Sequence, residues 1–166
     1  MTAATLRLST GDALVYRCDV TTHRVIVSDG AGRLRFAFGG HGSRTGQLDT
    51  PLDVALVAPE FHGEHLPARV EHLLWIAVAD YGNRRVQIFD LDGCFVGTVD
   101  DEADGVALGG PCRLVWRSPV LDVEHVDGRR SRVHLAAALL YGSARGRLSR
   151  RPGVALDRAR AWEVWH

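Results

Sequence analysis

The sequence contains no lysine: all 20 basic residues are arginine, and 20 acidic residues balance them to a formal net charge of zero. We interpret the missing lysine as codon bias of a GC-rich genome rather than as a functional feature. There is accordingly no Gly-Lys-Ser/Thr of a P-loop, and the glycine-rich stretch 39–42 leads to Pro51 and an expected strand instead of a helix. The sequence therefore excludes a P-loop or a dinucleotide fingerprint, and these glycines are predicted to shape a loop.

Cysteine is also scarce, with three residues (Cys18, Cys94 and Cys112) and no Cys-x-x-Cys spacing. An odd number without paired spacing argues against a disulfide framework and indicates a reducing compartment. The neighbours of the cysteines are apolar, so we expect packed rather than nucleophilic thiols. The N-terminus lacks the apolar run of a signal peptide, and no segment reaches the ~20 apolar residues of a membrane helix. We therefore predict a soluble cytoplasmic protein that does not enter a membrane.

The motifs of common hydrolases are missing as well, since there is no Gly-x-Ser-x-Gly elbow and no His-Glu-x-x-His zinc motif. The cluster with metal-like composition is His62, His65 and His72, with glutamates beside it. Imidazole and carboxylate suit zinc or a similar ion. Gly63 and Pro67 lie among these histidines and leave no clear helix, so an exposed polar loop is the preferred interpretation. We predict no cofactor, with a divalent metal as the alternative.

Glycine, by contrast, is frequent, with 18 residues that fall mostly at turn positions. Residues 74–96 show the resulting pattern: apolar residues end at Asp80, a turn follows over 81–84, and polar and apolar residues alternate over 85–89 before a second turn at 91–93. A chain of 166 residues, 46% of them hydrophobic, is long enough for one domain with a core. We predict an all-β fold of short antiparallel strands.

This pattern repeats along the chain. With a shift of 61 positions, residues 15–34 align with residues 76–95 without a gap, so that Asp and Arg recur five residues apart around a turn. A fainter third copy begins after residue 126. We predict that each carboxylate caps the turn and that the arginine bonds back to it; the predicted pairs are Asp19 with Arg24, Asp80 with Arg85, and Asp127 with Arg132.

A second pattern surrounds these pairs. Residues 42–48 (GSRTGQL) are echoed by residues 142–148 (GSARGRL), and each is followed by a proline and a Val-Ala-Leu strand. The complete unit is a glycine-rich loop, an apolar strand, a strand ending in Asp, a strand beginning at Arg, and a fourth strand after a glycine turn. Four antiparallel strands in a meander form the blade of a β-propeller.

The segments Phe38–Leu56 and Trp75–Asp90 resemble the NHL-repeat family of propellers. The resemblance is close over 36–97, recognisable over 14–35 and 141–157, and poor over 117–140. It implies six-bladed propellers that serve as binding platforms for proteins or RNA, while some related propellers are lyases or lactonases with a metal in the central channel.

The chain departs from that family in length. At roughly 40–45 residues per blade it makes about three and a half blades, which we place at 1–38, 39–98 and 99–140, with a partial blade over 141–166. Residues 58–72 are an insertion in the second blade. The single NHL-like repeat domain is therefore predicted to be a partial propeller, completed by a homodimer, or a truncated fragment without independent activity.

The repeat and the lack of catalytic motifs favour a non-enzymatic binding or scaffold module that recognises a protein, peptide or small ligand. The exposed turn residues Tyr81, Asn83 and Arg84 are the predicted contacts. The alternative is a metal-dependent lyase or hydrolase of the propeller kind. Nucleic acid is not favoured: residues 145–160 are arginine-rich, with tryptophans nearby, but the chain has no net charge and no recognised RNA motif.

Overall fold

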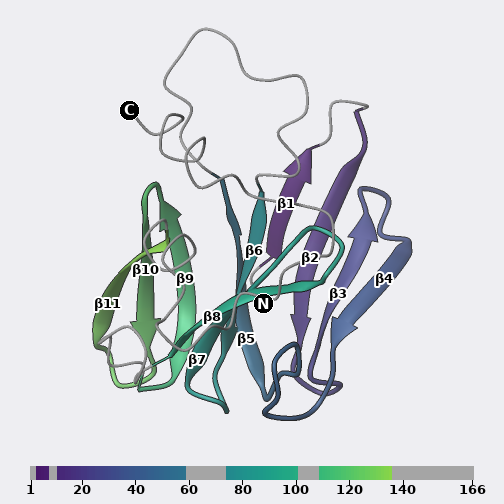
Figure 1. Cartoon of the computed structure of the whole chain (residues 1–166). Coiled ribbons are helices and arrows are strands. Elements are labelled where there is room, and N and C mark those ends of the chain that lie inside the picture. Colours follow the sequence, from purple (N-terminus) through teal and green to yellow (C-terminus); the bar gives the residue numbers. More distant parts are fainter. Residues whose placement is uncertain (1–2, 8–10, 59–73, 101–108, 136–166) are drawn as a thin grey trace, which may run out of the picture.

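The computed structural model describes residues 3–7, 11–58, 74–100 and 109–135 (Figure 1). These residues form three antiparallel sheets, which confirms the predicted all-β class. Sheet 1 contains β1 (Ala3–Arg7), β2 (Ala13–Asp19), β3 (Arg24–Asp29) and β4 (Leu34–Gly39); sheet 2 contains β5 (Pro51–Val57), β6 (Trp75–Asp80), β7 (Arg85–Phe89) and β8 (Phe95–Asp100); sheet 3 contains β9 (Pro111–Arg117), β10 (Val120–His125) and β11 (Arg130–His134).

Each sheet is a meander in which strands consecutive in the chain are neighbours. Sheet 2 lies between sheets 1 and 3 (Figure 1), and its first strand, β5, contacts both β1 and β9. The first strands of the three sheets are therefore adjacent, and the later strands of each sheet lie progressively farther from them. Among the described residues, no helix has the length and hydropathy to cross a membrane.

Sheet 2 is buried on both faces, even along β7, where the polar residues that alternate with apolar ones, Arg85 and Gln87, are buried as well. Every residue of β7 is buried, and so is every residue of β6 after Trp75. Side chains on one face, such as Ala77 and Ile88, belong to a core shared with sheet 3. Those on the other face, such as Val78, belong to a core shared with sheet 1. The outer sheets instead show alternating burial, as expected for sheets packed on one face.

The predicted internal repeat is present in three dimensions. Asp19 pairs with Arg24 in the register of sheet 1, as Asp80 pairs with Arg85 in sheet 2. A register shift follows Val27 in one sheet and the equivalent Ile88 in the other. The 61-residue shift in sequence therefore matches strands, turns and bulges of sheets 1 and 2. Strand β1 lies before the aligned residues and was not predicted from the repeat.

The third copy of the repeat was aligned wrongly. Strand β10 ends at His125, before Asp127, and the following turn has the hydrogen bonds of the glycine turns at 29–33 and 90–94. In it the His125 amide donates to Arg129 O (2.9 Å), and Gly128 has φ of 82°. Asp-Gly favours this turn because glycine adopts positive φ without strain, so Asp127 lies inside the turn instead of preceding it. The predicted partial blade over 141–166 lies outside the described residues.

Candidate functional site

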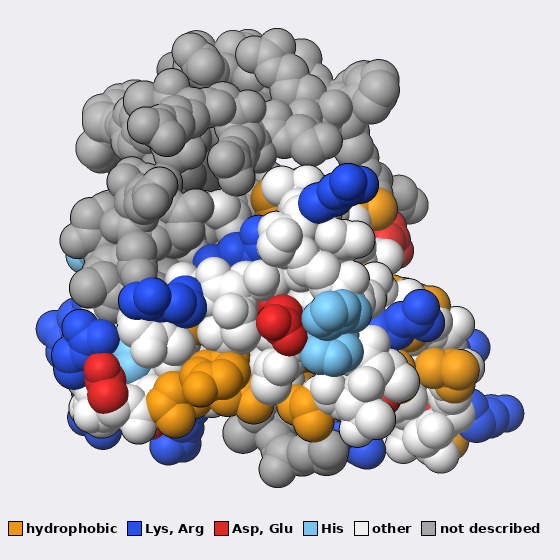
Figure 2. All heavy atoms as spheres, turned by 90° about the horizontal axis from the view of Figure 1, so that it is seen from below, with side chains coloured by type: hydrophobic (Ala, Val, Ile, Leu, Met, Phe, Trp, Pro, Cys, Tyr) orange, Lys and Arg blue, Asp and Glu red, His pale blue; other side chains and the backbone are white. Residues whose placement is uncertain are grey.

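The turns at one end of the sheets form a common surface, which we call the turn face. It consists of the turns at 20–23, 81–84 and 126–129 and of the loop 40–50 that joins sheet 1 to sheet 2, all at the lower end in Figure 1. Figure 2 views the molecule from this end and shows histidine side chains next to an acidic side chain, with hydrophobic side chains near them.

A buried polar network holds the loop 40–50 in place. Arg85 Nε donates to Asp80 Oδ2 at 2.7 Å, and the two side chains are 10% and 0% exposed. The remaining nitrogens of Arg85 donate to the carbonyls of Ser43, Arg44 and Gln47 at 2.9–3.0 Å. Because these carbonyls belong to the loop, the ion pair ties sheet 2 to it and leaves little of the guanidinium unsatisfied.

Asn83 belongs to the same network. Its side-chain amide donates to Gly42 O at 2.9 Å and to the Asp80 carboxylate at 2.9 and 3.1 Å. Although sequence reasoning grouped Asn83 with the ligand contacts, the structure gives it a role in holding the loop. The other two predicted ligand contacts, Tyr81 and Arg84, are exposed on the same turn. Arg84 has a φ of 54°.

The other two predicted Asp–Arg pairs are arranged differently. Asp19 accepts hydrogen bonds from the Thr22 hydroxyl (2.7 Å) and the Thr21 amide (2.9 Å), which lower the pKa of its carboxyl. These bonds cap the turn as predicted, but they come from threonines rather than from Arg24. In sheet 3 the ion pairs are between other residues, with Asp127 bound to Arg129 and Arg132 bound to Asp122.

Each of the three turns of the turn face carries an exposed apolar side chain. The described residues include four exposed large hydrophobic side chains, and Val20, Tyr81 and Val126 lie on its turns, while Leu34 lies at the opposite end of sheet 1. Tyr81 and Val126 meet over Gly110: a Cβ built there would lie 3.0 Å from the tyrosine ring and 3.2 Å from Val126. Tyr81 and Val126, which are 37% and 59% exposed, thus bring the turns of sheets 2 and 3 together at Gly110.

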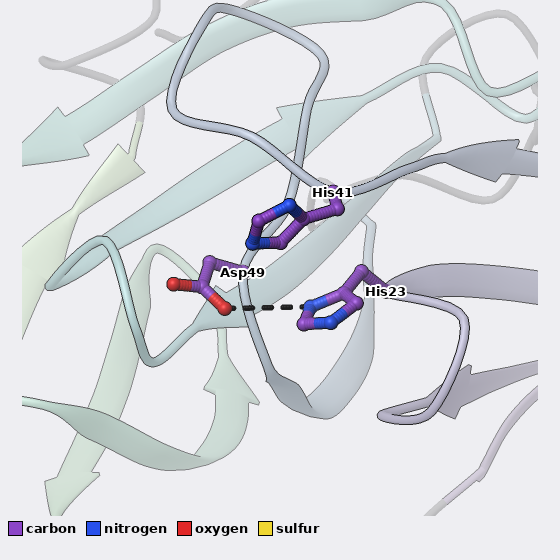
Figure 3. Close-up of side chains that lie close together, drawn as sticks. All are labelled: His23, His41 and Asp49. Carbon is purple, nitrogen blue, oxygen red and sulfur yellow. Dashed lines mark ion pairs between the residues drawn. The ribbon is translucent and has the colours of Figure 1, made fainter.

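The second feature of the face is a group of three potential metal ligands, His23, His41 and Asp49 (Figure 3). His23 ends the 20–23 turn with a φ of 55°, and the other two come from the loop 40–50. His23 Nδ1 lies 3.3 Å from Asp49 Oδ1, and the two imidazole rings are 4.5 Å apart between centroids. Asp49 and His23 are partly buried, and His41 is exposed.

Sequence reasoning missed this group because its members follow no ligand spacing. They come together only through the path of the loop 40–50, which the sequence assigned to glycine conformations. The histidines that the sequence did single out, His62, His65 and His72, lie outside the described residues.

The cysteines were all expected to be packed, but Cys94 is exposed; Cys18 is buried and Cys112 is partly buried. Burial, with a smaller contribution from the Asp53 carboxylate, raises the pKa of Cys18 to about 12. Burial and Glu124 are the first two causes that raise the pKa of Cys112. A raised pKa leaves the thiol protonated at neutral pH, and the thiolate is the nucleophilic form.

Comparison with protein-family models found no match for this sequence, and comparison with curated proteins found none either.

Proposed function

We propose that the chain is a non-enzymatic binding module, built from NHL-like repeats of a partial β-propeller, that recognises a protein or peptide on its turn face. The observation that carries the proposal is that Val20, Tyr81 and Val126 are exposed on the three turns of that face, with Tyr81 and Val126 both beside Gly110. Aromatic and aliphatic side chains left exposed in one region are typical of sites that another protein covers.

The repeat architecture supports this proposal. Three successive meanders place their first strands side by side, so the turns that follow β2, β6 and β10 meet at one end. Binding residues commonly sit on loops that a rigid scaffold positions. Here the scaffold is the buried network around Arg85, which fixes the loop between two of these turns.

Arg84 extends the proposed contact surface. It is exposed on the same turn as Tyr81, and arginine is enriched, with tyrosine, among the residues that dominate binding energy at protein interfaces. The proposal therefore favours a peptide that offers an apolar side chain together with a carboxylate.

The test is a selection of binding peptides from a displayed random library with the full chain as target. Peptides that bind the turn face should lose at least about tenfold in affinity with Tyr81→Ser or Val126→Ser, since truncation of a dominant contact costs over 1–2 kcal/mol. Arg84→Ala should weaken binding of acidic peptides.

Leu34→Ser is the matched control, because Leu34 is 67% exposed but lies at the opposite end of sheet 1. The control should leave peptide affinity unchanged. Peptides that respond to Leu34→Ser and not to the turn-face variants would show that recognition uses another surface, and the proposal would be wrong.

A further inference from the structure

We propose that His23, His41 and Asp49 bind a divalent transition-metal ion of the zinc type. This inference is independent of peptide binding, because it rests on other side chains of the turn face. Two imidazoles and one carboxylate form a donor set suited to zinc, and three protein ligands leave a coordination position for solvent. The potential ligand atoms all lie within 4.8 Å of one another.

The distances fit a small metal ion. Tetrahedral zinc with bonds of about 2.0–2.1 Å places its ligand atoms roughly 3.3 Å apart. His23 Nδ1 and Asp49 Oδ1 already have that separation, at 3.3 Å. His41 is exposed and comes from the loop beside them (Figure 3), and its ligand nitrogen lies within 4.8 Å of the other two ligand atoms.

His23 and Asp49 present two acceptor atoms side by side. The Thr50 amide donates to His23 Nδ1 at 3.0 Å, so this nitrogen presents a lone pair. Asp49 Oδ1, which also accepts from the Thr50 hydroxyl at 3.0 Å, lies next to it. These two acceptor atoms, 3.3 Å apart, are close enough to share one metal ion. It would take the place of the Thr50 amide at Nδ1.

The backbone holds two of the ligands in position before any ion binds. Gly40 N donates to His23 O at 2.8 Å, which ties the 20–23 turn to the loop that carries the other two ligands. Asp49 N donates to the buried Asp80 carboxylate at 2.6 Å, and Gly82 N donates to Asp49 O at 2.9 Å. Pre-positioned ligands lose little conformational entropy on binding, which favours affinity.

The test is a titration of the purified chain, free of any histidine tag, with Zn²⁺ by calorimetry and with Co²⁺ by visible absorption. Because His62, His65 and His72 offer other imidazoles, the background protein should carry all three as alanine. We expect one ion per chain and ligand-field bands of a low-symmetry Co²⁺ site. Mg²⁺ should not compete, since it prefers oxygen ligands.

Three substitutions should each weaken Zn²⁺ binding by at least about tenfold: His41→Ala, Asp49→Asn and His23→Asn. Asparagine is chosen at position 23 because it accepts the positive φ there. His134→Ala is the matched control, an exposed histidine on β11, and should bind Zn²⁺ as the background does.

His41→Ala is the decisive variant, because this exposed side chain can be removed with little risk to folding. Unchanged Zn²⁺ affinity in His41→Ala would overturn the proposal. Loss of all Zn²⁺ binding in the background protein, relative to the natural sequence, would assign the ion to the other histidines and would also overturn it.

Discussion

At the scale of single residues, Arg85 is the charged partner of a buried carboxylate, and it shares Asp80 Oδ2 and Gln47 O with the side chain of Gln87. Its pair with Asp80 is almost fully buried, and it also bonds to three carbonyls of the loop 40–50. We expect Arg85→Ala to lower the free energy of unfolding by about 3–5 kcal/mol, since it leaves a buried carboxylate without its counter-charge. Urea denaturation followed by tryptophan fluorescence measures this change.

The matched control is Arg129→Ala in sheet 3. Arg129 also pairs with an aspartate, Asp127, at 2.6 Å, but the two side chains are 56% and 47% exposed. Exposed pairs contribute about 0–1 kcal/mol, because water screens them. Equal effects of the two substitutions would mean that burial of the Asp80 pair does not matter to stability.

The same residues show how far the sequence could predict interactions. The spacing of Asp80 and Arg85 indicated a bond across a turn, and that bond is present. The spacing could not show that Arg85 continues into the loop, nor that Asn83 is used there, because those partners are about 40 residues away in the chain. Nor could it show that threonines take the place of Arg24 at Asp19.

At the scale of elements, the glycine turns of sheets 1 and 2 offer a paired experiment. Gly32 and Gly93 occupy the same turn position, with φ of 82° and 79° and equivalent hydrogen bonds. A Cβ on Gly32 meets nothing within 4 Å, whereas one on Gly93 would lie 2.5 Å from the ring of Phe38 in sheet 1. The backbone strain of an alanine is therefore equal at the two sites, and the steric cost is not.

Gly32→Ala should destabilise the chain by about 1–2 kcal/mol from the positive φ alone. Gly93→Ala should cost a further 1–3 kcal/mol or so, because Phe38 must move within a packed core. Denaturation curves of the two variants give the difference, which reports on packing between sheets 1 and 2. If both variants lose the same stability, Phe38 does not pack against this turn.

Element prediction succeeded where the repeat was strong. The strands and turns of 74–96 follow from alternation and from turn residues, and the shift of 61 transferred them to sheet 1. It failed in sheet 3, where Asp127-Gly128 forms the glycine turn instead of the Asp–Arg turn. An aspartate suits both kinds of turn, and only the register of β10 with β11 distinguishes them.

At the scale of the whole molecule, sheets 1 and 3 each have an outer face that sheet 2 does not cover. Both faces are rich in arginine. On sheet 3, Arg113, Arg117, Arg130 and Arg132 surround the acidic residues Asp122 and Glu124. On sheet 1, the residues between the buried positions include the exposed Arg7, Arg17 and Arg24. The half-buried Val15 and Ile26 lie among the arginines on the outer face of sheet 1.

Closure of a ring by a second copy would place the outer face of sheet 1 against the partner's sheet 3. Because both faces are basic, we expect such a dimer to form at high ionic strength, where the screening length is about 3 Å, and to dissociate at low ionic strength, where it is about 30 Å. Light scattering on a sizing column should then give about twice 18.2 kDa only in high salt.

Arg17→Glu should allow the dimer in low salt, because it removes a positive charge from one face and adds a negative one. A mass of 18.2 kDa in every condition, for both proteins, would exclude this closure and leave the arginine faces to solvent or to acidic partners.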